Sequence, residues 1–161
     1  MRKLVPIEQL IEQAEQDGIN TVLLMLACLR RLLLLNQSTR EGKFRGDIDR
    51  KGSHELYDRT VGIVGFGDIG RRVAKLCYGF GANIIYSKRK PVPYALRADF
   101  KARPVSLDEL LSTSDVVTLH IPSLESNRGM IGWAQLAKMK PSAYIINTSR
   151  GTVIDLSLIH I

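Results

Sequence analysis

The stretch VGIVGFGDIGRRVAK, from Val61 to Lys75, decides the fold of this chain. A short apolar run leads into glycines at 65, 67 and 70, and residues with helical spacing follow. The pattern G-x-G-x-x-G at a strand-to-helix turn is typical of domains that bind dinucleotides. Gly65 would permit the tight turn, Gly67 would let a pyrophosphate approach the backbone, and Gly70 would let the helix lie close to the strand.

The start of the following helix is the expected phosphate site. The N–H groups around Asp68 and Ile69 would face the phosphates at the positive end of the helix dipole. A glycine turn without any ligand is the alternative interpretation. The strand before the glycines, the helix after them and a second strand at the expected interval favour nucleotide binding.

Strands that are apolar on both faces alternate with helices after residue 58. This order predicts an α/β fold, a doubly wound parallel sheet of the Rossmann type covered on both faces, with a helical arm before it. Ser106 should cap a helix, with Glu109 completing a capping box, and Gly18 should end the first helix. The expected strands are 60–65, 82–87, 115–121 and 143–149, and the expected helices are 5–16, 20–42, 68–80, 106–114 and 132–139.

Composition excludes few classes of function. The chain has 161 residues, 45% hydrophobic and 24% charged, which are values typical of a globular domain. Cys28 and Cys77 lie in apolar helical runs, so we expect buried free thiols in a reducing, cytoplasmic compartment. The net charge of +7 is compatible with binding to a nucleic acid, a membrane or a phosphorylated small molecule. The apolar run at 21–36 is broken by Arg30 and Arg31, so we expect a packed helix and no membrane span.

The end of the second strand bears on the choice of cofactor. The sequence YSKRK places Ser87, Lys88 and Arg89 where an NAD site usually has an acidic residue for the ribose hydroxyls. A carboxylate would repel a 2′-phosphate, whereas Ser87 can donate to it and Arg89 can pair with it bidentately. The sequence therefore favours NADPH over NADH as the form of NAD(P). A solvated basic loop is the alternative.

Three ordered segments carry a resemblance to a known family. They are ELYDRTVGIVGFGDIGRRVAKLCYGFGANIIYS, SLDELLSTSDVVTLHIPSLESNRGMIG and LAKMKPSAYIINTSRGTVID. Over roughly residues 20–155 the chain resembles the nucleotide-binding domain of the D-isomer-specific 2-hydroxyacid dehydrogenases. This resemblance implies a two-domain, usually dimeric oxidoreductase that moves a hydride between nicotinamide and C2 of a small 2-oxo or 2-hydroxy acid.

The resemblance also implies roles for residues near the nicotinamide. Ile121 and Pro122 should line the nicotinamide side, and Thr148 and Ser149 should lie near its ribose. Arg150, in NTSRG, matches the catalytic arginine of the family. A permanently charged, planar guanidinium suits a substrate carboxylate and polarises a neighbouring carbonyl. A surface arginine at a strand end is the alternative, and no metal ligand is expected.

The chain also departs from the family pattern. The catalytic histidine and its glutamate are expected beyond the last residue, because His54, His120 and His160 match neither. We expect residues 1–58 to be a remnant of the interdomain and dimerisation arm, 59–155 to be the NAD(P)-binding domain, and 156–161, LSLIHI, to be unrelated to the family. The chain is then a truncated dehydrogenase, inactive alone.

Two other functions are considered. A non-catalytic NAD(P)-binding regulatory module would fit the missing histidine. A nucleic-acid binder fits poorly, because aromatic residues are only 6% and no recognition helix is visible. The expected partners are a small acid substrate and a second copy of the chain bound through the helical arm, with no nucleic acid and no membrane.

Overall fold

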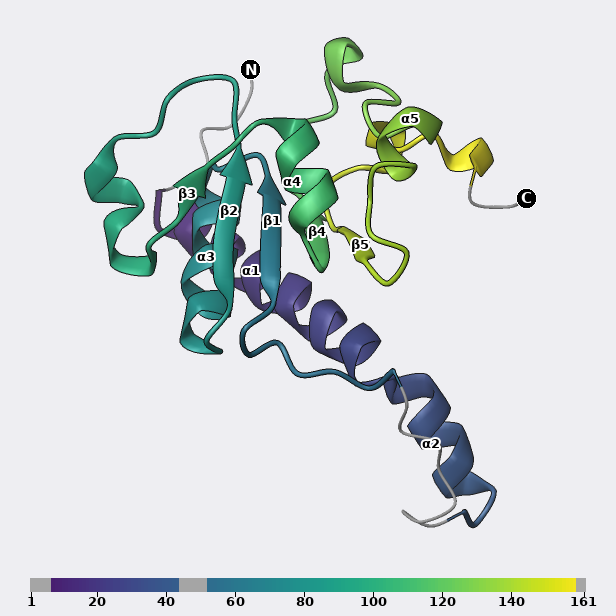
Figure 1. Cartoon of the computed structure of the whole chain (residues 1–161). Helices are drawn as coiled ribbons and strands as arrows, with labels where there is room; N and C mark the ends of the chain where they lie inside the picture. The colour runs from purple at the N-terminus through teal and green to yellow at the C-terminus, as the bar shows by residue number, and fades with distance from the viewer. Residues whose placement is uncertain (1–6, 44–51, 159–161) are drawn as a thin grey trace.

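Five parallel strands form one sheet in the computed structural model, which describes residues 7–43 and 52–158. The spatial order is β3-β2-β1-β4-β5 (Figure 1). The direction of winding reverses between β1 and β4, and the carboxyl ends of strands at such a point are where open α/β sheets bind ligands. The strands are β1 (Thr60–Val64), β2 (Asn83–Ser87), β3 (Arg103–Pro104), β4 (Val116–Leu119) and β5 (Tyr144–Asn147).

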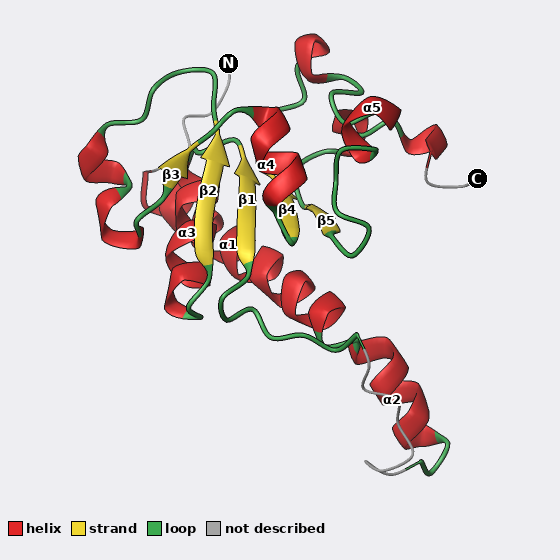
Figure 2. Ribbon diagram, viewed as in Figure 1, coloured by secondary structure: helices red, strands yellow, loops and turns green. Residues whose placement is uncertain are grey.

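Helices cover both faces of the sheet (Figure 2). One face packs against α1 (Ile7–Leu29) and α3 (Asp68–Gly79), and the other against α4 (Leu107–Thr113) and α5 (Trp133–Leu136). A further helix, α2 (Leu32–Arg40), has no buried residue and extends away from the sheet. The doubly wound parallel fold predicted from the sequence is confirmed.

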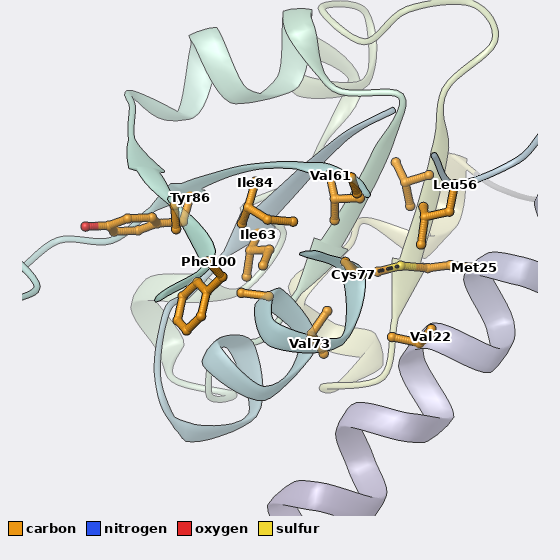
Figure 3. Close-up of a cluster of buried hydrophobic side chains, with 14 of the residues drawn as sticks. Val22, Met25, Leu56, Val61, Ile63, Val73, Cys77, Ile84, Tyr86 and Phe100 are labelled. Atoms are coloured by element: carbon orange, nitrogen blue, oxygen red, sulfur yellow. Dashed lines mark hydrogen bonds between the residues drawn. The ribbon is translucent and has the colours of Figure 1, made fainter. Parts of the chain in front are cut away.

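The core consists of one apolar layer on each face of the sheet. Along β1, Val61 and Ile63 point toward α1 and α3, whereas Val64 belongs to the layer under α4. In the first layer, Cys77 of α3 lies against Met25 of α1, with a sulfur–sulfur distance of 3.8 Å (Figure 3). Burial raises the pKa of the Cys77 thiol to about 12, so it behaves as an unreactive core residue, as expected.

Helix α1 runs through Gly18, so the prediction that Gly18 ends a helix is wrong. Gly18 is buried where α1 meets α3, and a Cβ built there would lie 2.8 Å from Cγ of Arg72. The glycine therefore serves close helix packing rather than termination. The sequence could not distinguish these roles, because both use the absence of a side chain.

The predicted helix 20–42 is also wrong, since the chain breaks between α1 and α2 at Arg31. Arg31 is left-handed, with φ 53°, and the Leu29 carbonyl accepts a bond from the His54 N–H, at 2.8 Å. The segment between α2 and β1, which contains His54, therefore binds the carbonyl at the end of α1. No single helix in residues 7–43 or 52–158 is long and apolar enough to cross a membrane, although 16–29 and 32–40, bent by 60°, pass that test as a pair.

Smaller differences concern element ends. The observed strands are shorter than predicted by one to three residues, α5 covers only half of the predicted helix 132–139, and the short β3 was not predicted. Ser106 caps α4 as expected, accepting the Glu109 N–H at 3.1 Å. The Glu109 carboxylate accepts from Arg103 at 2.7 Å, so only half of the capping box forms.

The packing at Gly18 leads to a first prediction. Replacing Gly18 with Val should lower the free energy of unfolding by about 1–3 kcal/mol, because the new side chain overpacks the contact between α1 and α3. Gly79→Val is the matched control, since a Cβ at Gly79 meets nothing within 4 Å. Urea denaturation followed by circular dichroism measures both, and equal effects would contradict the packing role.

Candidate functional site

The glycine turn after β1 joins three strands and a helix. Gly65 has φ +93°, a conformation that side chains other than glycine rarely adopt, and a Cβ there would lie 2.3 Å from the His120 carbonyl oxygen. Its N–H donates to the Ser87 carbonyl at 2.9 Å. Gly65 thereby brings together the carboxyl ends of β1, β2 and β4.

The other two glycines differ in what they meet. A Cβ at Gly70 would lie 2.3 Å from the Gly65 carbonyl oxygen, so Gly70 permits the close contact between α3 and the turn. A Cβ at Gly67 would meet nothing within 4 Å, and its φ of −91° is open to any residue. Internal packing therefore gives no reason for glycine at 67, which is consistent with a ligand approaching the backbone there.

Two arginines follow the glycines and have separate roles. Arg71 donates to the Asp68 carboxylate at 2.5 Å and, more weakly, to the Gly67 carbonyl at 3.4 Å. This ion pair offsets the negative charge of Asp68 at the start of α3, where a phosphate would lie. Arg72 packs against Gly18 of α1.

A cavity of about 310 Å³ lies between the glycine turn and the ends of β2 and β4. Ser87, Lys88 and Arg89 line it, so the structure brings the predicted ribose-side residues to the glycine turn. Lys88 Nζ donates to the Phe66 carbonyl at 3.1 Å. Arg89 Nη2 donates to Oδ1 of Asn127 at 2.6 Å. Both cations therefore remain beside the cavity on acceptors that carry no charge.

A second cavity, of about 530 Å³, adjoins the first. Residues 120–122 line both cavities, and Ile69, from the start of α3, also lines the second cavity. Thr148, Ser149 and Arg150, which follow β5, form the opposite wall. The predicted nicotinamide-side residues and the predicted catalytic arginine thus lie on the same crevice as the glycine turn.

The loop after β5 is held by Asn147, which sequence reasoning missed. Its Oδ1 accepts from the N–H of Ser149 at 3.0 Å and from the Ser149 hydroxyl at 2.8 Å. Its Nδ2 donates to the Arg150 carbonyl at 2.9 Å. The exposed Arg150 guanidinium donates to the Ser149 carbonyl at 2.8 Å, and its other donors are free for an anionic group.

Helix α1 lines the second cavity through Asp17, and Thr21, one turn further along, contacts Thr148 in its wall. Sequence reasoning missed both residues. The Thr21 hydroxyl, fully buried, lies 2.8 Å from the Asp17 carbonyl and 2.8 Å from the Thr148 hydroxyl. A carbonyl only accepts, so Thr21 donates to Asp17 and Thr148 must donate to Thr21. Thr148 is then left with acceptor capacity toward the crevice. The available sequence signal for this contact was a single polar residue, Thr21, in the apolar run TVLLMLACL.

His120 lies in the wall between the two cavities. Its Nε2 is 2.9 Å from the hydroxyl of the buried Thr118. Burial is the main influence and lowers the pKa of His120 to about 4, while the charge of Asp17 acts in the opposite direction. His120 is therefore neutral at pH 7, and with its contact to Thr118 it is suited to a structural role.

Comparison with known proteins identifies the family. The profile of the D-isomer specific 2-hydroxyacid dehydrogenase NAD-binding domain matches residues 22–160. The chain belongs to the D-isomer specific 2-hydroxyacid dehydrogenase family. Its matched part is the NAD-binding domain of these oxidoreductases, as predicted. The matched range includes 156–160, and the expectation that this tail is unrelated to the family stays a prediction.

Three relatives illustrate the match. The chain is 40% identical over 144 residues to a glyoxylate reductase of Thermococcus gammatolerans and 42% identical over 133 residues to a hydroxypyruvate reductase of Thermotoga maritima. Each alignment covers 82% of this chain and 41% of the relative. A solved glyoxylate reductase from Paecilomyes thermophila superimposes with a TM-score of 0.81 at 38% identity, covering 92% of this chain and 44% of that one. The chain thus spans about two fifths of the curated relatives it matches.

The environment of His120 predicts a dependence of stability on pH. The pKa of His120 is lower in the folded state than the ordinary value of 6.5, so the unfolded chain binds more protons between pH 6.5 and about 4. The free energy of unfolding should fall over this window by up to about 3 kcal/mol. Thermal melts of the protein and of His120→Gln measure the effect, which should be smaller in the variant. His54→Gln is the control, and equal pH slopes for all three proteins would refute the prediction.

Proposed function

We propose that the chain forms the NADP(H)-binding half of an oxidoreductase that transfers a hydride between nicotinamide and C2 of a small 2-oxo or 2-hydroxy acid. One observation carries the proposal: Gly67 and Arg150 border two adjoining cavities that share residues 120–122, at the carboxyl ends of parallel strands. The first suits a diphosphate, and the second suits the carboxylate of an acid substrate.

The diphosphate would bind at residues 65–70. The backbone at Gly67 is exposed and sterically open, and the positive end of α3 begins immediately after it. The Asp68 carboxylate, which would oppose an anion there, is paired with Arg71. The pair lowers the local negative charge without removing a backbone donor from the turn.

The preference for NADPH rests on the end of β2. Ser87 lines the cavity at the position where a carboxylate would repel a 2′-phosphate, and two cations follow it. Arg89 reaches across the cavity to a neutral acceptor, so its full charge is retained. A guanidinium in that place would add charge-assisted hydrogen bonds to the phosphate.

The substrate would enter beside Arg150. Its guanidinium would hold the carboxylate and polarise the carbonyl that receives the hydride. The names of the relatives support glyoxylate or hydroxypyruvate as the substrate. Thr148, with its proton directed to Thr21, would accept a hydrogen bond from a ribose hydroxyl of the cofactor.

The proton for the substrate oxygen would come from outside the described crevice. His120 is the histidine that lines it, and at neutral pH that imidazole is uncharged and bonded to Thr118. We therefore expect the chain alone to bind cofactor without turnover. The same observation supports the second candidate, a regulatory NAD(P)-binding module. A histidine and a glutamate encoded downstream of codon 161 would exclude that candidate.

The partner of the helical arm would be a second copy of the chain. Leu33 of α2 is 83% exposed, and Leu23, Leu24 and Leu32 form exposed apolar surface beside it. Neither face of α2 packs against the sheet. The division of the chain into an arm at 1–58 and a domain at 59–155 belongs to this proposal. The arm is not wholly separate, because the inner side of α1 packs into the core of the domain. A cytoplasmic location is also part of the proposal.

Gly67→Ala tests the phosphate site. The added Cβ meets no atom of the chain, so the free energy of unfolding should change by less than about 1 kcal/mol, the usual range for exchanges at a helix N-cap. Affinity for NADPH should fall at least about tenfold, because the methyl group occupies space that the diphosphate needs. Isothermal calorimetry measures both proteins, and unchanged affinity would contradict the assignment.

Arg89→Ala tests the cofactor preference. The protein should bind NADPH more tightly than NADH, and the variant should lose about 10- to 100-fold in affinity for NADPH while NADH binding changes little. Lys101→Ala, an exposed cation away from this cavity, is the control. Equal affinities of the original protein for the two cofactors would defeat the proposed preference.

Leu33→Glu tests the dimer. A charge on the most exposed leucine of α2 should shift the molecular mass from dimer toward monomer, since burying an unpaired carboxylate is costly. Analytical ultracentrifugation of the protein and the variant measures the shift. A monomeric mass for both would refute the proposed assembly. Gln37→Glu, on the same helix, is the charge-matched control.

A further inference from the structure

A chain of hydrogen bonds crosses the first cavity from the end of β2 to the loop after β4. Arg89 Nη2 donates to Oδ1 of Asn127 at 2.6 Å, and Asn127 Nδ2 donates to the Pro122 carbonyl at 2.8 Å. In the sheet, β1 lies between these two strands, and the glycine turn that follows β1 lines the same cavity as Arg89 and Asn127. Arg89 is thereby fixed on the rim of the cavity.

Asn127 is built into the fold. Its side chain is almost fully buried, with 4% of the residue exposed, and its N–H donates to the Leu124 carbonyl at 2.9 Å. Arg89, by contrast, is exposed, and an arginine side chain without a partner samples many rotamers. The two contacts of Arg89 with Ser126 are both 3.5 Å long, so the short bond to Asn127 is the one that orders the guanidinium.

The neutrality of Asn127 matters for an anionic ligand. An amide oxygen holds the guanidinium without cancelling its charge, whereas a carboxylate would cancel it. A guanidinium has five N–H donors, so one bond to Asn127 leaves others for a phosphate. An ordered arginine also pays less conformational entropy when the ligand binds, about 0.5–1.5 kcal/mol for a side chain of this kind.

We propose that Asn127 is a positioning residue that sets the preference for NADPH over NADH by holding Arg89 at the 2′-phosphate. This inference rests on the proposed binding of NADP(H). Asn127 acts on the ratio of the two affinities, because only NADPH has the phosphate that Arg89 would contact. A residue that merely stabilised the loop would change both affinities alike.

Asn127→Thr is the principal test. The threonine hydroxyl ends one bond short of both amide atoms, so the variant loses the acceptor for Arg89 and also the donor to the Pro122 carbonyl. The second loss affects both cofactors alike, whereas the first affects only the ratio of their affinities. The ratio of NADPH to NADH affinity, measured by calorimetry on the full chain, should fall about 2- to 12-fold, the equivalent of ordering one long side chain. Asn83→Thr, the same exchange at the opposite end of β2, should leave the ratio unchanged.

A double-mutant cycle isolates the route through Arg89. In the Arg89→Ala background, Asn127→Thr should produce no further change in the ratio, because the group that it positions is absent. Asn127→Ser is the second variant and keeps the proposal testable if the threonine variant fails to fold. It removes the acceptor for Arg89 without adding a charge, so the ratio should fall as far as with threonine.

The outcomes separate this inference from the proposed function. NADPH preference in the original protein, together with an unchanged or raised ratio in folded Asn127 variants, overturns the role of Asn127 and leaves the proposed function standing. A fall in the ratio that persists in the Arg89→Ala background also overturns it. Absence of binding to either cofactor in the original protein overturns both, and a fall that needs Arg89 supports both.

Discussion

The contacts of Gly65 are the constraint on which the crevice depends. Its N–H donates to the Ser87 carbonyl of β2, and its own carbonyl lies against Gly70 of α3. Any side chain at Gly65 would collide with the His120 carbonyl, just after β4, and would also be strained at φ +93°. Because three strand ends and one helix meet at this residue, the positions of the two adjoining cavities, and with them of the proposed cofactor site, follow from it.

The sequence predicted the sheet well because its signals are local. The glycine motif and the apolar runs identified four of the five strands and the helices α3 and α4, of which α4 begins at the predicted Ser106 cap. The resemblance to the family suggested Ile121 and Arg150 as site residues, and the residues at the end of the second strand suggested Ser87. All three lie at or just beyond the carboxyl ends of parallel strands, so they line the same pair of adjoining cavities.

The features that sequence missed depend on contacts between distant segments. Gly18 has the same signature as a helix terminator, and only its contact with Arg72 shows that it permits packing. Thr21 and Thr148 are 127 positions apart, and Arg89 and Asn127 are 38 apart. No periodicity links such pairs, and polar residues in a loop carry no sign of their partner until the fold brings them together.

Electrostatics around the turn have a common logic. The acidic group nearest the expected phosphates, Asp68, is neutralised by Arg71, whereas Lys88 and Arg89 are held by an uncharged carbonyl and an uncharged amide. The fold therefore reduces negative charge and preserves positive charge at the same edge of the crevice. Because both cations are exposed, pairing them with carboxylates would add little stability, but it would cancel the charge available to an anionic ligand.

Helix α1 links the crevice to the surface that we propose for assembly. Its inner side places Thr21 against Thr148 and Met25 against Cys77, while Leu23 and Leu24 on its outer side are exposed. Every third or fourth residue of α1 is therefore committed to the core or to the wall of the second cavity, and the leucines between them are left exposed. The same helical spacing that builds the crevice also produces the apolar surface that we propose for assembly.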